Sequence, residues 1–343
     1  MVLRSDNMNL STLRDSFCGA VCAGAVTITV ISAQAQNLFV SDLGSSNIYE
    51  FTPDGVRSAF ASGLLQPAGL AFNSTGDLFV SELGSGNIYK FTPDGARSTF
   101  ASGLSSPDGL AFNRGGELFE ADSGSGNIYK FTPSGAQTTF ASGFADPVAL
   151  AFSGSGDLFV ADAVNATIYR LTADGGESTF ATGLQGPFGL AFNSAGDLFV
   201  SDYNSGNIYK FTPDGVSNTF VSGLVGPPYA LAFDSGGNLF DSQFFGGQIY
   251  EFTPGGDKST FTSGLAYPMA LAFQPVSTLQ AVATGGKFQV AVAMPSPYHS
   301  TVIQTSTNLA DWVNIYTNTP PFTFTNSMTT TSSCCYYRAV LGP

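Results

Sequence analysis

GDLFVSELGSGNIYKFTPDGARSTFASGLSSPDGLAFNRG, from Gly76 to Gly115, is one copy of a unit that occurs six times in this chain. The copies begin at Asn37, Asp77, Glu117, Asp157, Asp197 and Asn238. Their period is therefore 40 residues and lengthens once to 41. A repeat of this kind is typical of propellers and solenoids, and it indicates the fold before any single residue is considered.

Each unit divides into four short apolar segments with turn signals between them. In the second copy these are PAGLAF (67–72), DLFVSE (77–82), NIYKFTP (87–93) and ARSTFAS (96–102). In the turn TPDG, Pro93 presets φ and Gly95 tolerates a positive φ. In Leu78-Phe79-Val80 the residues at odd and at even positions are all apolar, and successive strand residues point to opposite faces. We therefore expect both faces of each sheet to be buried. Four strands per unit predict one propeller blade.

The order of the segments predicts how the ring closes. The first copy starts with a second strand, NLFVSD (37–42), whereas the last first-strand segment, PMALAF (268–273), has no further strands after it. Pairing these two segments completes six blades and removes the exposed sheet edges. We therefore number the blade completed by residues 268–274 as blade 1, and blades 2 to 6 follow along the chain.

The N-terminal segment has the features of a secretory signal. Arg4 and Arg14 lie in a polar leader, the apolar stretch FCGAVCAGAVTITVIS follows, and Ala33-Gln34-Ala35 offers small residues for cleavage. The stretch is short for a membrane span. We therefore expect residues 1–35 to be a signal peptide removed near Ala35 and the mature chain, without a membrane span, to be secreted, extracellular or periplasmic, as a monomer.

The sequence predicts an all-β protein of two parts after the leader: a six-bladed propeller over residues 36–276 and a small β module over 277–343. In the module, LQAVATGGKFQVAVA reads as a hairpin. The only mature cysteines are Cys334 and Cys335, so no disulfide framework is expected. The chain has 12 Lys and Arg but 25 Asp and Glu, and its basic residues form no continuous stripe. Nucleic acid is therefore not expected as a partner.

The motifs P-x-G-L-A-F, G-D-L-F-V-S-D and N-I-Y-K-F, over about residues 37–275, resemble the NHL repeat and the senescence-marker-protein/gluconolactonase group of six-bladed propellers. The resemblance implies the fold, while propellers of this type serve as scaffolds, lyases and lactonases alike. The run I-Q-T-S-T-N-L-A-D-W with a terminal Y-Y-R-A-V resembles β-sandwich tails of secreted bacterial proteins, which implies attachment or packing.

Catalysis by a nucleophile system is not expected in the propeller. It has no histidine and, once the leader is removed, no cysteine; the chain's one histidine, His299, lies in the tail. A Ser/His/Asp or Cys/His arrangement is therefore excluded there. No catalytic residue is predicted, and we interpret His299 as a loop residue.

The resemblance also implies a divalent cation, held by a Glu two residues before a first-strand Pro, an Asn of an N-G pair and the Asp of a P-D-G triplet. Only the last is present, as Pro107-Asp108-Gly109. The Glu position holds Leu65, Ser105, Ala145, Gln185, Gly226 and Ala266 in the six copies. A hard cation needs several oxygen donors, which counts against a lactonase.

Departures from the repeat suggest other roles for acids. Glu120 and Asp241 replace the valine of LFV in blades 3 and 6, which lie opposite each other, too far apart for the carboxylate pair of glycoside hydrolysis. Asp108, Glu120 and Asp122 could share a corner of blade 3 and hold calcium, or they could be solvated channel residues.

The acid that recurs after the second strand is expected to accept backbone N–H groups of the next turn. It is Asp42, Glu82, Asp122, Asp162 and Asp202, with Gln243 in the last copy.

Aromatic residues gather on one expected face, where the loops entering the first strands and those following the second strands emerge. Large aromatics at a channel mouth favour a ligand platform for carbohydrates, peptides or proteins. Packing against the tail module is the alternative. The residues are Phe188, Tyr203, Tyr229, Phe244, Phe245 and Tyr267.

These observations favour a secreted, non-catalytic propeller that binds a ligand or acts as an interaction scaffold. No cofactor is required, although calcium stays open. The first alternative is a calcium-dependent lactonase or hydrolase of the gluconolactonase type, and the second is a propeller lyase.

Overall fold

The computed structural model describes residues 36–275 except residue 225, and beyond them the backbone of strands β1, β2 and β27–β32. The described chain is built of strands and contains no helix, and within it no helix is long and apolar enough to cross a membrane. The chain divides into two compact units, one of Ala35–Pro275 and the other of Met1–Gln34 with Val276–Pro343.

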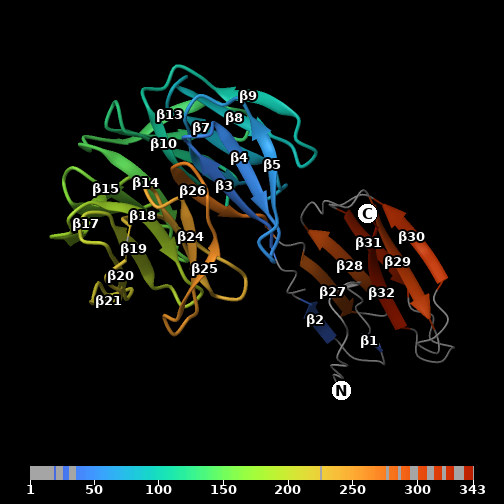
Figure 1. Cartoon of the computed structure of the whole chain (residues 1–343). Coiled ribbons are helices and arrows are strands. Elements are labelled where there is room, and N and C mark those ends of the chain that lie inside the picture. Colours follow the sequence, from blue (N-terminus) through green and yellow to red (C-terminus); the bar gives the residue numbers. More distant parts are fainter. Residues whose placement is uncertain are drawn as a thin grey trace. The chain divides into compact units, whose positions relative to one another are not determined.

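The first of these units is a six-bladed β-propeller of four-stranded antiparallel sheets (Figure 1). Blade 1 consists of β26 (Pro268–Phe273), β3 (Leu38–Asp42), β4 (Asn47–Phe51) and β5 (Arg57–Ser62). Blade 2 consists of β6 (Pro67–Phe72), β7 (Leu78–Glu82), β8 (Asn87–Phe91) and β9 (Arg97–Ala101). Blade 3 consists of β10 (Pro107–Phe112), β11 (Leu118–Asp122), β12 (Asn127–Phe131) and β13 (Gln137–Ser142).

The remaining blades repeat this order. Blade 4 consists of β14 (Pro147–Phe152), β15 (Leu158–Asp162), β16 (Thr167–Leu171) and β17 (Glu177–Thr182). Blade 5 consists of β18 (Pro187–Phe192), β19 (Leu198–Asp202), β20 (Asn207–Phe211) and β21 (Ser217–Val221). Blade 6 consists of β22 (Pro228–Phe233), β23 (Leu239–Gln243), β24 (Gln248–Phe252) and β25 (Lys258–Thr262).

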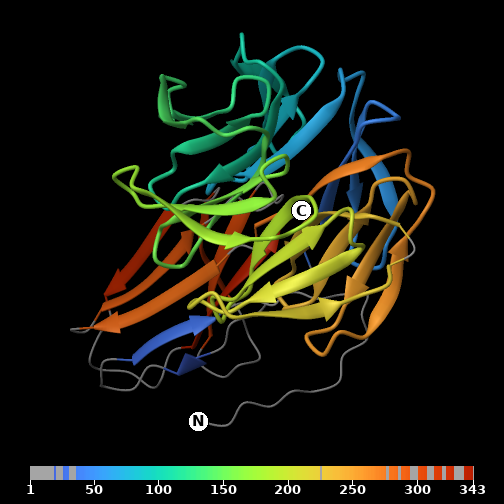
Figure 2. The same cartoon turned by 90° about the vertical axis from the view of Figure 1, so that its left-hand side faces the viewer.

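The ring closes as the segment order predicts. The last propeller strand, β26, pairs with the first, β3, in the register Leu271↔Val40 and Phe273↔Leu38 (Figure 2). Each first strand also contacts the first strand of the next blade, β26 with β6 included, so the six first strands surround the central axis. The predicted six-bladed propeller and its closure are confirmed.

Burial decreases from the centre of a blade to its rim. The second strands are buried at all five positions in every blade, whereas the fourth strands begin with three exposed residues. Between blades, the phenylalanine of each second strand packs edge-on against two others: Phe159, for example, lies 4.9 Å from Phe180 and 5.0 Å from Phe192, between ring centroids. The sequence predicted burial of both faces because apolar residues occur at odd and even positions. This prediction is confirmed for the second strands.

A serine of the second strand links neighbouring blades at the centre. Ser81 Oγ accepts the backbone N–H of Gly69 at 2.7 Å and donates to the carbonyl oxygen of Asp108 in the next blade at 2.6 Å. A Cβ on Gly69 would lie 2.1 Å from that carbonyl oxygen, so only glycine permits this approach. The backbone of Asp108 is thereby fixed against blade 2.

The other unit contains two four-stranded sheets, ordered β1-β32-β29-β30 and β2-β27-β28-β31. Residues of the expected leader pair here, β2 with β27 in the register Val26↔Ala283. His299, Cys334 and Cys335 lie outside the described residues. The strands are β1 (Gly19–Ala20), β2 (Val26–Val30), β27 (Thr278–Thr284), β28 (Lys287–Ala293), β29 (Ser300–Ser306), β30 (Val313–Asn318), β31 (Phe322–Ser327) and β32 (Tyr336–Gly342).

Candidate functional site

The candidate site lies at one end of the propeller, where two sets of loops meet. In blades 1 to 5, backbone hydrogen bonds join the loop after the second strand to the loop entering the first strand of the same blade. In blade 2 the N–H of Leu83 donates to the carbonyl of Gln66 at 3.1 Å, and in blade 5 that of Tyr203 donates to Gly186 at 2.8 Å. This end of the central channel is called the mouth below.

Six aromatic side chains at the mouth form one contiguous group, here called the aromatic cluster. Their ring contacts run from blade 5 through blade 6 to blade 1: Phe188 to Tyr229 at 4.7 Å, Tyr229 to Phe244 at 5.2 Å and Phe244 to Tyr267 at 5.3 Å, between centroids. Tyr203 and Phe245 complete it, each touching at least two other members. The structure thus brings together all six residues that the sequence proposed for a platform.

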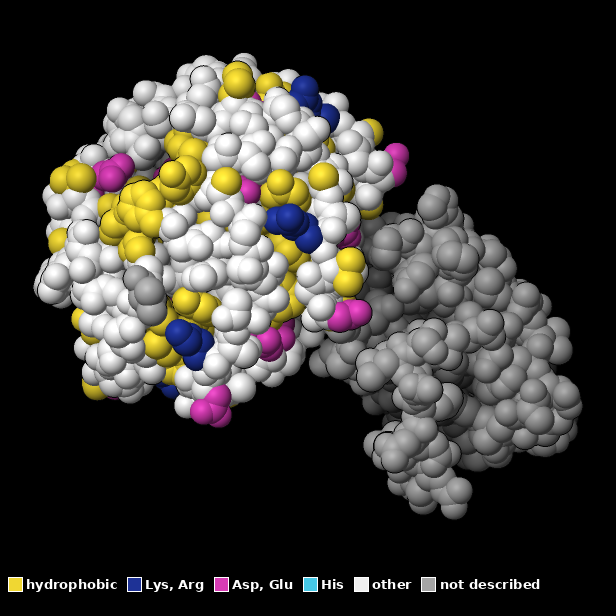
Figure 3. Space-filling model, viewed as in Figure 1, with side chains coloured by type: hydrophobic (Ala, Val, Ile, Leu, Met, Phe, Trp, Pro, Cys, Tyr) yellow, Lys and Arg dark blue, Asp and Glu magenta, His cyan; other side chains and the backbone are white. Residues whose placement is uncertain are grey.

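Two members of the aromatic cluster project from the surface. Phe245 is 65% exposed and Tyr267 is 44% exposed, while the other four are partly buried. On the propeller face shown in Figure 3, hydrophobic side chains gather in patches among few charged ones. Exposed large rings have an unfavourable contact with water, which burial against a ligand would remove.

Asp108 lies on β10, at the position in blade 3 that Tyr229 occupies in blade 6. Its side chain keeps only part of its area exposed. Burial raises the pKa of Asp108 to about 7, and the negative charge of Asp146 adds to this shift. The carboxyl group is therefore divided between its protonated and ionised forms at neutral pH.

Asp146 is a mouth residue that sequence reasoning did not single out. It lies in the loop entering β14, with its side chain partly exposed, and burial together with the charge of Asp162 raises its pKa. A signal was present, because the residue before the first-strand proline is acidic in no other copy. The charges of Asp108 and Asp146 both contribute to raising the pKa of Tyr229, after its burial. The two carboxyls and this ring therefore share the mouth.

Glu120 and Asp241 lie deeper, on second strands, and neither has exposed area. Both carboxyl oxygens of Glu120 lack a hydrogen-bond partner among the described residues. Burial, with the charges of Asp122 and Asp108, raises the pKa of Glu120 to about 9, so the group is neutral at pH 7. Asp241 accepts the N–H of Tyr229 at 3.3 Å and a bond from Gln243, and burial raises its pKa well above the usual range.

The three carboxylates considered for a cation, Asp108, Glu120 and Asp122, differ in their hydrogen bonding. Asp122 directs its oxygens to the backbone, accepting the N–H of Ser105 at 2.7 Å and that of Ser125 at 2.9 Å. Within the described part of the chain, no three His, Cys, Asp or Glu side chains are grouped so that they could hold a metal ion. Both oxygens of Asp122 are thus engaged by backbone donors, and calcium binding by Asp108, Glu120 and Asp122 stays a prediction.

The acid that recurs after the second strand accepts backbone N–H groups as expected, but the predicted donor in the following turn is found only for Asp122 and Asp162, and the shared donor lies in the loop entering the first strand. Asp162, fully buried, accepts the backbone N–H groups of Ala145, Asp146 and Asn165 at 2.9, 3.1 and 3.0 Å. Each of the other four acids accepts the N–H two residues before its blade's first-strand proline. The donors to Asp42, Glu82, Asp122 and Asp202 are Ala266, Leu65, Ser105 and Gln185.

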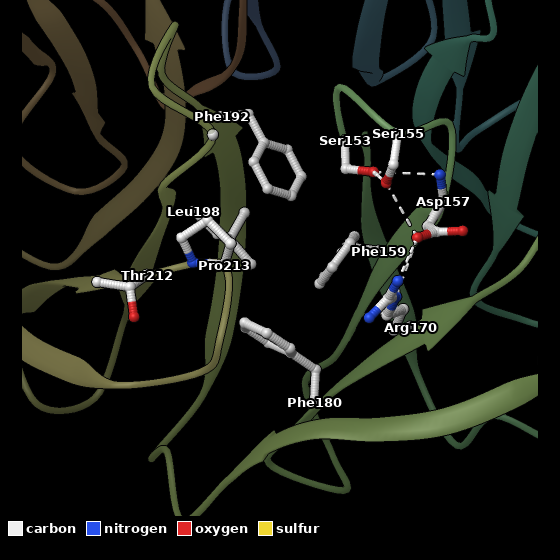
Figure 4. A pocket seen from close by; sticks show the side chains of 11 residues that line it. Ser153, Ser155, Asp157, Phe159, Arg170, Phe180, Phe192, Leu198, Thr212 and Pro213 are labelled. Atoms are coloured by element: carbon white, nitrogen blue, oxygen red, sulfur yellow. Dashed lines mark hydrogen bonds and ion pairs between the residues drawn. The ribbon is translucent and has the colours of Figure 1, made fainter.

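Small cavities between blades repeat around the ring and belong to the fold. One of about 110 Å³ lies between blades 4 and 5, where Phe159, Phe180 and Phe192 face it and Arg170 bonds Asp157 at 2.6 Å (Figure 4). Similar cavities lie between blades 3 and 4 and between blades 6 and 1. Their repetition follows from the repeat and marks none of them as a special site.

No protein-family model matches the chain, and no curated protein matches its sequence significantly. Many solved structures match its fold. One is a histidine-to-alanine variant of virginiamycin B lyase from Staphylococcus aureus, described as catalytically inactive and solved with quinupristin. It is 16% identical with a TM-score of 0.57, and the match covers 76% of this chain and 96% of that one.

Two other matches have different functions. A gluconolactonase from Xanthomonas campestris is 16% identical with a TM-score of 0.59, covering 94% of this chain and all of the other. A chain of a nidogen/laminin complex is 18% identical with a TM-score of 0.65, covering 70% of this chain and 98% of that one. At these identities the likeness shows the fold alone: the chain is a six-bladed propeller similar to gluconolactonase-like and streptogramin-lyase propellers.

Proposed function

We propose that this protein is a binding propeller whose aromatic cluster holds the ring or apolar part of a ligand. The observation that carries the proposal is the continuous contact of six aromatic side chains from three blades, two of them largely exposed. Aromatic rings supply large contact areas with little loss of side-chain entropy. Ligands with flat apolar faces, such as carbohydrates and peptides with ring side chains, fit this surface.

The enzyme alternatives have the support of a shared fold with lyase and gluconolactonase propellers, but residues 36–275 offer few of the groups expected for such chemistry. The solved lyase with its histidine replaced is described as inactive, and residues 36–275 of this chain contain no histidine. The lactonase alternative requires a cation, and the described acids offer no group of three ligands.

Removing two rings from the centre of the aromatic cluster tests the proposed function. We expect Tyr203→Ala/Tyr229→Ala to weaken binding to polysaccharide or peptide arrays at least about tenfold, since an aromatic pair adds ~0.5–1.5 kcal/mol beyond its buried area. Tyr129→Ala is the matched control, because Tyr129 lies on β12 and outside the aromatic cluster. Equal retention of the double variant and the control would refute the role of these rings.

We also propose that the protein is exported and cleaved near Ala35. The polar leader, apolar stretch and small residues of the N-terminal segment support this. The intact mass of protein recovered from the medium or periplasm is expected to correspond to a chain starting near Gln36. Recovery of exported protein with residues 1–35 still attached would contradict cleavage, and would fit the pairing of β2 with β27 instead.

A further inference from the structure

The mouth combines aromatic rings with acidic groups and contains no basic side chain. None of the eight Lys and Arg residues between 36 and 275 belongs to a first strand, a second strand, or a loop at the mouth. They lie on third and fourth strands or in the turn after β10: Arg57, Lys90, Arg97, Arg114, Lys130, Arg170, Lys210 and Lys258. No basic residue of the propeller is therefore placed to neutralise the acids of the mouth.

The repeat places rings and a carboxyl group around the same axis. The residue after the first-strand proline is Asp108 in blade 3, Phe188 in blade 5 and Tyr229 in blade 6, and the first strands contact one another in a ring. The rings of Phe188 and Tyr229 touch, while the flanking blades contribute only buried Ala68 and Val148 beside Asp108. Asp108 and Asp146 thus lie on one side of the mouth and the aromatic cluster on the other.

The acids of the mouth have few partners of their own. Among the described residues, none forms a hydrogen bond or ion pair with the carboxyl groups of Asp108 and Asp146, although Asp108 is largely enclosed. Below Asp108, both oxygens of the fully buried Glu120 are also unpartnered among the described residues. Glu120 stays neutral at pH 7, whereas an enclosed carboxyl group that ionises without a partner, as Asp108 does above pH 7, favours a ligand that brings positive charge.

We infer that the mouth binds an organic cation, an ammonium group joined to an apolar or ring substituent. The ammonium group lies between Asp108 and Asp146 and the faces of Phe188 and Tyr229, and its substituent packs on the remaining rings. A cation within about 6 Å of an aromatic centroid is attracted to the ring face, and the carboxylates add opposite charge. A neutral sugar would leave these acids unpaired, and an anion would be repelled. This inference rests on the proposed binding role of the aromatic cluster.

Binding of a permanent cation is expected to strengthen with pH. The titratable groups that act on one another at this end of the channel are Asp108, Asp146, Glu120 and Tyr229, with Asp122, Asp162 and Tyr203 acting on them. Of these, Asp108 changes charge near pH 7, while Glu120 and Tyr229 stay neutral there. Above pH 7 the ionised Asp108 attracts the cation, so affinity rises from pH 6 to pH 8.

Two probes separate the cationic inference from the broader proposal. Benzyltrimethylammonium carries a charge at every pH, and benzyl alcohol offers a similar ring without charge. Calorimetry at pH 8 on the full chain is expected to give at least about tenfold tighter binding of the cation, consistent with the strength of a desolvated cation–π contact. Asp108→Asn should weaken binding of the cation about fivefold or more and leave binding of the alcohol unchanged. The control Asp214→Asn makes the same charge change on an exposed turn and should change the binding of neither probe.

Each result supports or overturns the inference. Suppose that both probes bind equally, and that Tyr229→Ala weakens this binding but Asp108→Asn does not. This result would refute the cationic ligand and would still support the aromatic site. If neither probe binds, the cationic inference is also refuted. The array experiment would then be the test of the aromatic cluster. Asp146→Asn provides a second variant if Asp108→Asn unfolds the protein.

Discussion

Asp162→Ala is expected to lower the free energy of unfolding by about 3–5 kcal/mol, because each buried donor that loses its partner costs about 1–3 kcal/mol. Three backbone N–H groups donate to this carboxylate, and the side-chain amide of Asn165 adds a fourth bond at 2.9 Å. For a propeller of this size such a loss lowers Tm by roughly 10 °C. Thermal melting followed by circular dichroism measures it.

A matched control separates this effect from the loss of a charge. Asp214 is an acid of an exposed turn in blade 5, and Asp214→Ala should change stability by less than about 0.5 kcal/mol. Asp162→Asn keeps an oxygen acceptor and should fall between the two. Equal melting of Asp162→Ala and the control would show that water satisfies these donors and that the carboxylate is not needed to join the two loops.

The second large effect is expected from Glu120→Gln and depends on pH. The pKa of Glu120 is raised to about 9 in the folded chain from a usual 4.5. The folded chain therefore keeps a proton that the unfolded chain releases above pH 4.5, so the group's stability contribution is complete below pH 4.5 and is lost as pH rises toward 9. At about 1.4 kcal/mol per pH unit, the native chain loses roughly 3 kcal/mol between pH 4.5 and pH 7.

Glutamine has the shape of the neutral acid and does not ionise, so the variant escapes this loss. Its stability should equal that of the native chain near pH 4.5 and exceed it by about 3 kcal/mol at pH 7. Asp108 and Asp241 remain in both proteins, so the difference isolates Glu120. Urea unfolding at several pH values measures it, and a difference that does not change with pH would refute the buried, neutral state of this carboxyl group.

Much of the candidate site was predictable because the repeat turns sequence position into spatial position. Equivalent residues of successive units lie at equivalent places around one axis, and the residues after the first-strand prolines, Phe188 and Tyr229 among them, therefore face the same mouth. The gathering of the aromatic cluster followed from that geometry alone. Asp146 was not predicted, because an acid before the first-strand proline occurs in one copy only and a single loop acid does not by itself indicate a site.

The roles of the acids could not be read in the same way. Asp122 and Glu120 are two residues apart on β11 and were considered as partners, yet one accepts two backbone N–H groups and the other accepts none in the described chain. Whether a carboxylate meets a donor depends in part on a loop that comes from the neighbouring strand, as Ser105, 17 residues before Asp122, shows. Residue type and spacing do not contain that information.

By itself, the sequence determined the number of blades, their four strands, the closure of β26 on β3 and the face on which the aromatic residues gather. These features depend on periodic apolar segments and on turns, which act locally and repeat in every unit. The tertiary structure alone decided which loop donates to the recurrent acids, which acids remain buried and neutral, and which lie at the mouth beside the rings. Those properties depend on burial and on non-local hydrogen bonds, which exist only once the blades pack against one another.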